Sequence, residues 1–185
     1  MASAIDQERR KKRCKKQGLT FIQFVKAGEG GQRKKSEGTG LLGAGTQWEM
    51  KVDVDTKLTF PEEVTTTTLR PDIVLWSRET RQLAMVELTV PWEERVEEAH
   101  QLKRDKYADL QAECAERGWK TWVFALEVGC RGFPAQSLWG ALRALGVAGQ
   151  SRSAAVRKAA EAAERASCWL WLRRDQKTWT HNERQ

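Results

Sequence analysis

The spacing of hydrophobic and polar residues divides the chain into strands and helices. From 48 to 54 ("WEMKVDV") apolar residues occupy every second position, which is typical of a strand with one face in water. The stretches 69–77 ("LRPDIVLWS") and 83–90 ("LAMVELTV") are almost continuously apolar and are separated by the turn-like "SRETRQ", which predicts two strands at the centre of a sheet. The segment 92–117 has acidic residues in its first turns, basic residues later and Gly118 behind it, a pattern that indicates a long helix.

A fourth strand and two more helices are predicted after this helix. The strand covers 119–129 ("WKTWVFALEVG"), and the helices cover 135–146 and 153–174. Since a helix separates the third and fourth strands, these two should pair in parallel through a right-handed crossover. The expected fold class is therefore α/β: a mixed central sheet of about four strands, flanking helices and a helical C-terminal part. Trp169 and Trp171, in the apolar end of the last helix, are expected in the core.

The first 40 residues differ from the rest in composition. Residues 1–40 contain eleven Lys and Arg against four Asp and Glu, whereas 41–185 contain twenty-one of each, so the net charge of +7 belongs to the first part. Seven of the fourteen glycines fall between 27 and 45, which marks a linker, and a short strand could form at 19–25. We therefore expect a basic flexible tail and linker at 1–40 and a folded domain at 41–185.

A run of cations near the N-terminus favours contact with nucleic acid. Between 9 and 16 it comprises Arg9, Arg10, Lys11, Lys12, Arg13, Lys15 and Lys16. Such a run attracts phosphate backbones or acts as a nuclear import signal. The alternative is a solvated arm that keeps the protein in solution.

Several classes of protein are not expected from this sequence. It has no run of about 18 apolar residues, so we expect no contact with a membrane, and no apolar h-region at its start, so we expect no secretion. The four cysteines and two histidines lack the spacing of a structural zinc site and suit a reducing compartment. The expected location is the nucleus, or otherwise the cytoplasm.

Asp72 and Glu87 interrupt the two most apolar strands. A buried carboxylate is costly unless it is paired, hydrogen-bonded or bound to a metal. Because adjacent strands can bring both side chains to one site, we expect them to share a Mg²⁺ or Mn²⁺ ion together with a backbone carbonyl and waters. Such an ion binds a phosphate oxygen and lowers the pKa of a bound water. The alternative is that each carboxylate caps a turn or pairs with an arginine such as Arg70.

The segments "RPD" and, after the hairpin, "ELT" resemble the PD-(D/E)XK nuclease superfamily, whose motif is Pro-Asp, a spacer and (Asp/Glu)-x-Lys on a strand–strand–strand–helix–strand core. Pro71, Asp72 and Glu87 match this motif, and the expected element order covers 48–129. More narrowly, "TTLRPDIVLWS", "ELTVPWEER", "KYADL" and "EVGCRGF" are similar to nuclease-like segments encoded with animal retroelement reverse transcriptases, over most of 41–174. No polymerase motif is present. The resemblance implies a restriction-endonuclease-like core and magnesium-dependent hydrolysis of DNA.

Thr89 stands where the superfamily motif has its lysine. Threonine can hydrogen-bond a water but supplies no positive charge to the developing phosphorane. Some members of the superfamily take this lysine from the following helix instead. From Glu87 to Pro91 the strand advances roughly 13 Å, at about 3.3 Å per residue, and a returning helix recovers about 1.5 Å per residue. This arithmetic sets Lys103 level with Glu87 and Lys106 about one turn further, so Lys103 is the expected substitute. The alternative is that both lysines are solvated.

Four further residues are weaker candidates, and one is expected to be structural. His100 lies on the predicted helix at a position suited to a general acid or base. Glu127 is a candidate for the metal shell, Arg131 for contact with phosphate, and Glu49 for an additional carboxylate. Tyr107 is expected to pack in the core.

Three functions remain open from the sequence. The first is a metal-dependent endonuclease-like domain of retroelement origin that cuts DNA and requires Asp72, Glu87 and a metal ion. The second is a catalytically inactive nucleic-acid-binding module of the same fold, which lost its lysine to Thr89. The third is an oligomerisation domain built on the Trp-rich C-terminal helix, which predicts a homodimer or larger species and neither DNA binding nor metal uptake.

Overall fold

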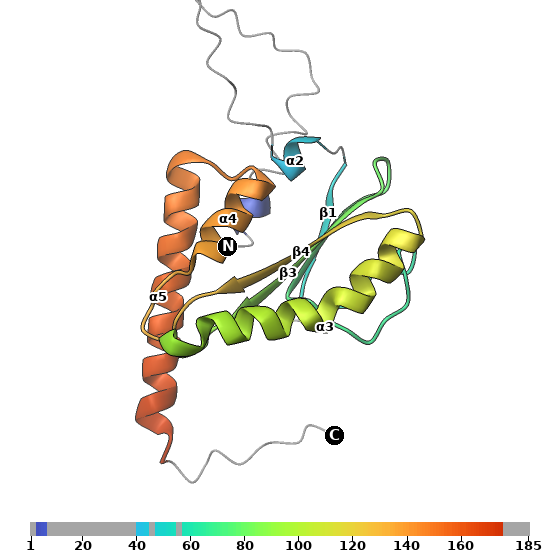
Figure 1. Ribbon diagram of the computed structural model, residues 1–185. Coiled ribbons are helices and arrows are strands. Elements are labelled where there is room, and N and C mark those ends of the chain that lie inside the picture. Colours follow the sequence, from blue (N-terminus) through green and yellow to red (C-terminus); the bar gives the residue numbers. More distant parts are fainter. Residues whose placement is uncertain (1–2, 7–39, 45–46, 55–56, 176–185) are drawn as a thin grey trace, which may run out of the picture.

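The computed structural model describes residues 3–6, 40–44, 47–54 and 57–175, and its centre is a four-stranded mixed sheet (Figure 1). The strands lie in the order β1 (Glu49–Val52), β2 (Ile73–Ser77), β3 (Gln82–Thr89) and β4 (Lys120–Glu127). The pairs β1–β2 and β2–β3 are antiparallel, and β3–β4 is parallel. The predicted α/β class, the mixed sheet and the parallel pairing across the long helix are therefore confirmed.

The helices cover both faces of this sheet. They are the short α2 (Leu41–Ala44), the 3-10 turn η1 (Glu93–Arg95), α3 (Val96–Glu116), α4 (Gln136–Leu145) and α5 (Gly149–Arg173). Helix α3 packs on one face, and α4 and α5 pack on the other (Figure 1). None of the described helices is both long enough and apolar enough to cross a membrane. The short strand predicted at 19–25 lies outside the described residues.

Alternate residues of β2 and β3 enter two separate cores. One set packs towards α4 and α5 and consists of Ile73, Leu75, Ala84 and Val86. The other set packs towards α3 and consists of Val74, Trp76, Leu83 and Met85. Because both faces of these central strands are covered, nearly every position is apolar, which explains the continuous hydrophobic runs in the sequence.

The C-terminal end of α5 is exposed, so the prediction that Trp169 and Trp171 lie in the core is wrong. Their side chains are 49% and 57% exposed. The residues by which α5 is buried lie in its first part, at Ala155, Val156 and Ala163. A helix of 25 residues spans about 37 Å at 1.5 Å per residue, and its red end in Figure 1 reaches beyond α3. The last turns of α5 therefore extend past the elements that bury the rest of the helix.

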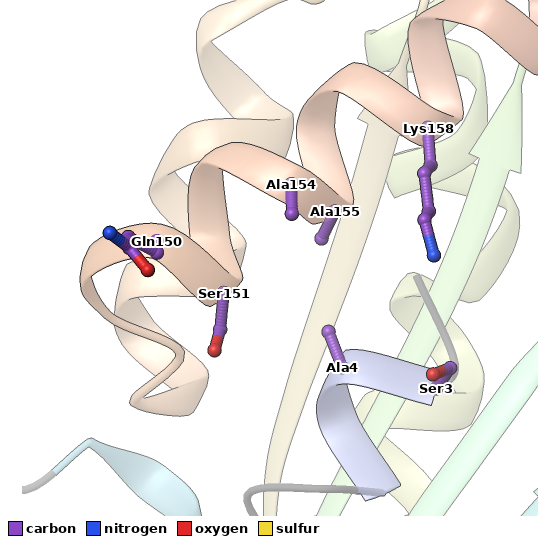
Figure 2. A pocket seen from close by; sticks show the side chains of 7 residues that line it. All are labelled: Ser3, Ala4, Gln150, Ser151, Ala154, Ala155 and Lys158. Carbon is purple, nitrogen blue, oxygen red and sulfur yellow. The ribbon is translucent and has the colours of Figure 1, made fainter.

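Residues 3–6 belong to the folded body, although the sequence assigned them to the basic tail. The Ile5 side chain is fully buried in the core on the α4 and α5 side. Figure 2 shows Ser3 and Ala4 beside Ala155 and Lys158 of α5, in a small cavity. The tail prediction is thus wrong for this first turn. The cationic run at 9–16 lies outside the described residues.

Gly40 also anchors the chain on this side. A Cβ atom on Gly40 would lie 2.2 Å from the backbone nitrogen of Gly146, which is closer than any side chain allows. Gly146 caps α4 with φ of 92°, a left-handed conformation that favours glycine. Two glycines therefore let the segment before α2 contact the end of α4.

Candidate active site

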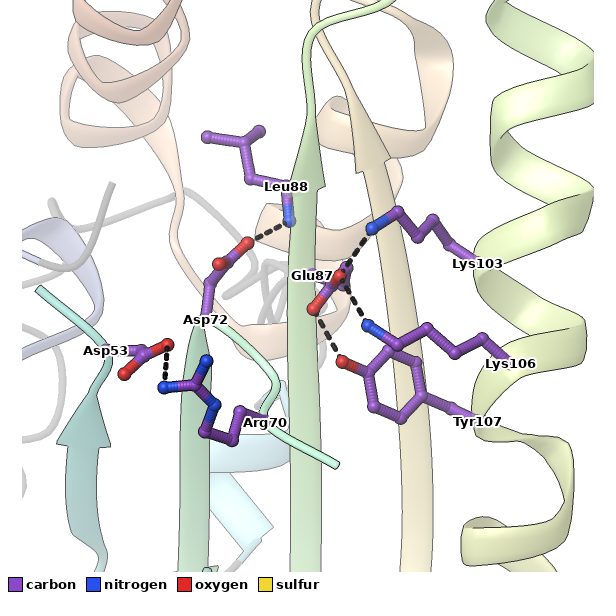
Figure 3. Close-up of polar contacts among 8 residues, drawn as sticks. All are labelled: Asp53, Arg70, Asp72, Glu87, Leu88, Lys103, Lys106 and Tyr107. Carbon is purple, nitrogen blue, oxygen red and sulfur yellow. Dashed lines mark hydrogen bonds and ion pairs between the residues drawn. The ribbon is translucent and has the colours of Figure 1, made fainter. Parts of the chain in front are cut away.

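Asp72 and Glu87 face α3 from neighbouring strands. In the antiparallel pair Ile73 lies opposite Val86, and continuing this register by one residue sets Asp72 opposite Glu87. The Asp72 Oδ2 atom accepts a hydrogen bond from the backbone nitrogen of Leu88 at 2.6 Å (Figure 3). The hairpin therefore holds both carboxylates at the same level of the sheet.

Three side chains of α3 converge on the Glu87 carboxylate, which is only 7% exposed (Figure 3). Lys103 Nζ donates to Glu87 Oε1 at 2.6 Å, and Lys106 Nζ approaches the same oxygen at 3.3 Å. The Tyr107 hydroxyl donates to Oε2 at 2.8 Å. These donors offset the cost of burying the charge.

The two carboxyl groups differ in their acidity. Burial raises the pKa of Asp72, and the nearby charge of Glu87 raises it further, whereas the Leu88 N–H lowers it. Burial alone would also raise the pKa of Glu87, but the hydrogen bonds from Lys103 and Tyr107 hold it below its ordinary value. Burial and the bond to Glu87 raise the pKa of Tyr107, which keeps its hydroxyl protonated as a donor. The surroundings therefore favour the ionised form of Glu87 and disfavour the ionised form of Asp72.

Lys103 and Lys106 lie at Glu87, not in free solvent. The rise per residue of a strand and of a helix predicted this position for Lys103. Tyr107 packs in the core on this side of the sheet, as expected, but it also donates to Glu87, which the sequence interpretation missed. Its spacing of four residues from Lys103 on one helix face was the available signal.

A second polar cluster lies beside the first, at the ends of β3 and β4. Glu127 is 1% exposed and lies opposite Thr89 in the parallel register. His100 Nδ1 is 3.1 Å from both Glu127 carboxylate oxygens, and the Ser137 hydroxyl donates to the same carboxylate. Thr89 Oγ1 is buried and has no hydrogen-bond partner within the described part of the chain. Ser137 was not a sequence candidate, because no motif surrounds it.

Other candidate residues have partners of their own. The exposed Arg131 bonds Glu93, with its backbone nitrogen at 2.9 Å and its Nε at 3.0 Å. Glu49, on β1, pairs with Arg78 at 3.2 Å. Arg70, the arginine considered as a partner for Asp72, instead pairs with Asp53 at 3.9 Å.

The Asp72 and Glu87 pair fits the ligand preference of a hard divalent cation. Mg²⁺ is usually held by one or two carboxylates, with waters and substrate phosphates completing six ligands. Within the described part of the chain Asp72 Oδ1 has no hydrogen-bond partner, and Lys103 already provides positive charge beside Glu87. No group of three or more His, Cys, Asp or Glu side chains suited to a metal occurs among the residues described. A divalent cation at this place would have only these two carboxylates as side-chain ligands among the described residues, a set that suits Mg²⁺ or Mn²⁺ better than zinc.

The chain was compared with known protein families and with curated proteins, and neither comparison gave a match. The placement of the acidic pair and of Lys103 is accordingly the main guide to function.

Proposed function

We propose that this domain is a metal-dependent endonuclease that hydrolyses DNA phosphodiester bonds. The observation that carries the proposal is the convergence on one face of the sheet of Asp72, Glu87 and Lys103, with the lysine nitrogen 2.6 Å from the glutamate. Two carboxylates and one ammonium group are the side chains that metal-assisted hydrolysis of a phosphodiester needs. The resemblance of "RPD" and "ELT" to the PD-(D/E)XK superfamily supports the same reaction and a retroelement origin, and the cationic run at 9–16 supports a nuclear location.

Each residue has a defined task in this reaction. A bound Mg²⁺ would supply a water of lowered pKa and a positive charge at the phosphate. Asp72 and Glu87 would hold that ion, and Tyr107 would keep the Glu87 carboxylate oriented by its 2.8 Å hydrogen bond. With a cation held by the two carboxylates, the Lys103 ammonium group would be available to face the charge that develops on the phosphate.

Thr89 and Lys106 have supporting tasks. The Thr89 hydroxyl has no partner among the described residues and can hold a water. Lys106, at 3.3 Å, is the weaker of the two lysine contacts with Glu87. Its ammonium group adds a second positive charge beside Glu87.

A second candidate is a nucleic-acid-binding module that has lost catalysis. It is favoured by Thr89 in place of the motif lysine, and by the ion pairs that already satisfy Glu87 without a metal. This module would bind DNA and not cut it.

Self-association is a third candidate, favoured by the exposed apolar end of α5. Trp169, Leu170, Trp171 and Leu172 are all at least 46% exposed. A homodimer formed through this surface would be detected by light scattering. It should become a monomer when Leu172, which is 72% exposed, is changed to lysine.

Cleavage of supercoiled plasmid separates these functions. The wild-type protein is expected to nick or linearise the plasmid with Mg²⁺ and to do neither with EDTA. Asp72→Ala should abolish cleavage, whereas Glu49→Ala, which removes an exposed carboxylate paired with Arg78, should not. Magnesium-independent cleavage, or equal cleavage by Asp72→Ala, would contradict the proposal. DNA binding without cleavage by wild type would establish the inactive module.

A further inference from the structure

A cationic cavity lies between α4 and the first turn of α5, away from the acidic pair. Its volume is about 430 Å³, and it is lined by Gln136, Trp139, Gly140, Arg143 and Arg152. The first four share one face of α4, because they are spaced by three, four and seven residues. The lining contains two positive charges and no carboxylate.

The two arginines of this cavity lack the carboxylate partners that several other described arginines have. Within the described chain, neither Arg143 nor Arg152 forms an ion pair, and the buried Nε of Arg152 has no hydrogen-bond partner. In contrast, the guanidinium groups of Arg78, Arg95 and Arg131 each lie within 3.2 Å of a carboxylate. Since a buried donor without an acceptor is costly, an anion in the cavity would stabilise this arrangement.

The cavity continues towards the candidate active site. Gln136 lines it and also lines the neighbouring cavity that contains His100 and Glu127. From Gln136 to Arg143 the helix rises roughly 10 Å, at about 1.5 Å per residue. One strand of duplex DNA carries a phosphate every 3.4 Å or so along its axis, so this face spans about three nucleotides.

We propose that Arg143 and Arg152 bind consecutive phosphates of one nucleic-acid strand, with Gln136 and Trp139 lining the path from there to the candidate active site. Guanidinium groups match phosphate oxygens in a bidentate fork, and an indole beside them can pack on sugar or base. The carboxylates of Glu93 and Glu97 line the neighbouring cavity from η1 and α3, so the strand should contact the α4 side of that cavity. The inference rests on the proposed function for the identity of the ligand.

Gly140 permits a test that does not disturb the fold. A Cβ atom at this position would meet no atom within 4 Å, and the residue lies inside a regular helix that glycine weakens. Gly140→Glu therefore introduces a carboxylate into the cavity, and Gly140→Gln introduces a neutral side chain of the same size. The comparison between these two variants separates the effect of charge on binding from the effect of packing.

The measurement is binding of a labelled DNA duplex to the full chain in EDTA, between about 50 and 200 mM salt. The salt slope is the magnitude of the slope of log binding constant against log salt concentration, and each lost phosphate contact should lower it by about 0.9. The affinity at 0.1 M salt should fall by about 8-fold for each lost contact. The double variant Arg143→Gln, Arg152→Gln should lose two contacts, and Gly140→Glu at least one. Gly140→Gln should bind like wild type. So should Arg157→Gln, a matched control, because the α5 arginine Arg157 already pairs with Glu161.

Three results would overturn the proposal. One is an unchanged salt slope in the double variant, and another is equal binding by Gly140→Glu and Gly140→Gln. The third would show that the cavity binds a small free anion and not a nucleic-acid strand. In that case inorganic phosphate would raise the melting temperature of Gly140→Gln but not that of Gly140→Glu, while both variants would bind the duplex with the same affinity. Because binding is measured in EDTA, these results do not depend on whether the plasmid is cut. Failure of this site is thereby distinguished from failure of the nuclease proposal.

Discussion

Lys103→Met is the most informative change at the candidate active site. It keeps an unbranched side chain that can cover the same apolar surface, and it removes the ammonium group that donates to Glu87 at 2.6 Å. Lys103 serves two roles in the proposed mechanism: it neutralises Glu87 without metal, and it stabilises the phosphate charge with metal. The change should therefore affect metal binding and cleavage in opposite directions.

Both effects have an expected size. Loss of one donor to the transition state costs about 2.7–4 kcal/mol, so cleavage should fall by about 10²-fold or more. A hydrogen bond between charged groups is worth about 1.5–3 kcal/mol, and it must be broken when a cation takes the place of Lys103. Removing this competitor should strengthen Mn²⁺ binding by about tenfold or more, since 1.4 kcal/mol corresponds to a factor of ten. Lys106, which still lies 3.3 Å from Glu87, should reduce the gain.

Calorimetric titration with Mn²⁺ and single-turnover plasmid cleavage measure the two quantities separately. Lys106→Met is the matched control and should change both less, because its contact with Glu87 is the longer one. Adding Thr89→Lys to Lys103→Met should restore part of the cleavage, since Thr89 points to the same face as Glu87. Weaker Mn²⁺ binding by Lys103→Met, or cleavage within a few-fold of wild type, would refute this account of the lysine.

Three other predictions concern stability, the basic run and the cysteines. Burial and the charge of Glu87 raise the pKa of Asp72, so its ionised form destabilises the fold. Asp72→Asn should therefore raise the melting temperature at neutral pH. This gain should vanish below the ordinary Asp pKa of about 3.9, where the carboxyl group is protonated in both the folded and the unfolded state. A pH-independent gain in melting temperature would contradict this. Replacing the cations at 9–16 by glutamine should flatten the salt dependence of DNA binding, whereas an unchanged slope would show that they do not contact DNA. Burial raises the pKa of the Cys114 thiol to about 11, so iodoacetamide at pH 8 should modify the exposed Cys168 first. Mass spectrometry can measure the order of labelling. Early labelling of Cys114 would show that its helix opens.

The sheet and the acidic pair can be predicted from the sequence because they depend on local rules. Strand periodicity gives the residues of one strand that share a face, so Asp72 and Glu87 can be expected on a common face once their strands are taken as neighbours. Strand and helix rises are nearly constant, which places Lys103 level with Glu87 across sixteen residues of chain.

Other features depend on contacts that no local rule specifies. The Ser137 hydroxyl reaches Glu127 only because α4 packs behind β4, and the pairing of a lone serine with a distant glutamate leaves no pattern in the sequence. Trp169 and Trp171 are predicted as core residues because they are apolar, but their exposure depends on how far α5 extends past the sheet. Ile5 is assigned to a charged tail because the residues that follow it are basic, and only the tertiary fold shows where it docks.

Ile5 and Leu42 are buried in one core, so the chain is anchored on the same side of the molecule at two points that are far apart in the sequence. The 33 residues from 7 to 39 connect the two anchor points. Closure entropy depends on the logarithm of the number of residues between two fixed points, with about 0.6 kcal/mol for each doubling. Insertions or deletions between these two anchors should therefore leave the free energy of unfolding almost unchanged, so that the docking of the N-terminal turn on α4 and α5 does not depend on the exact length of the segment that follows it.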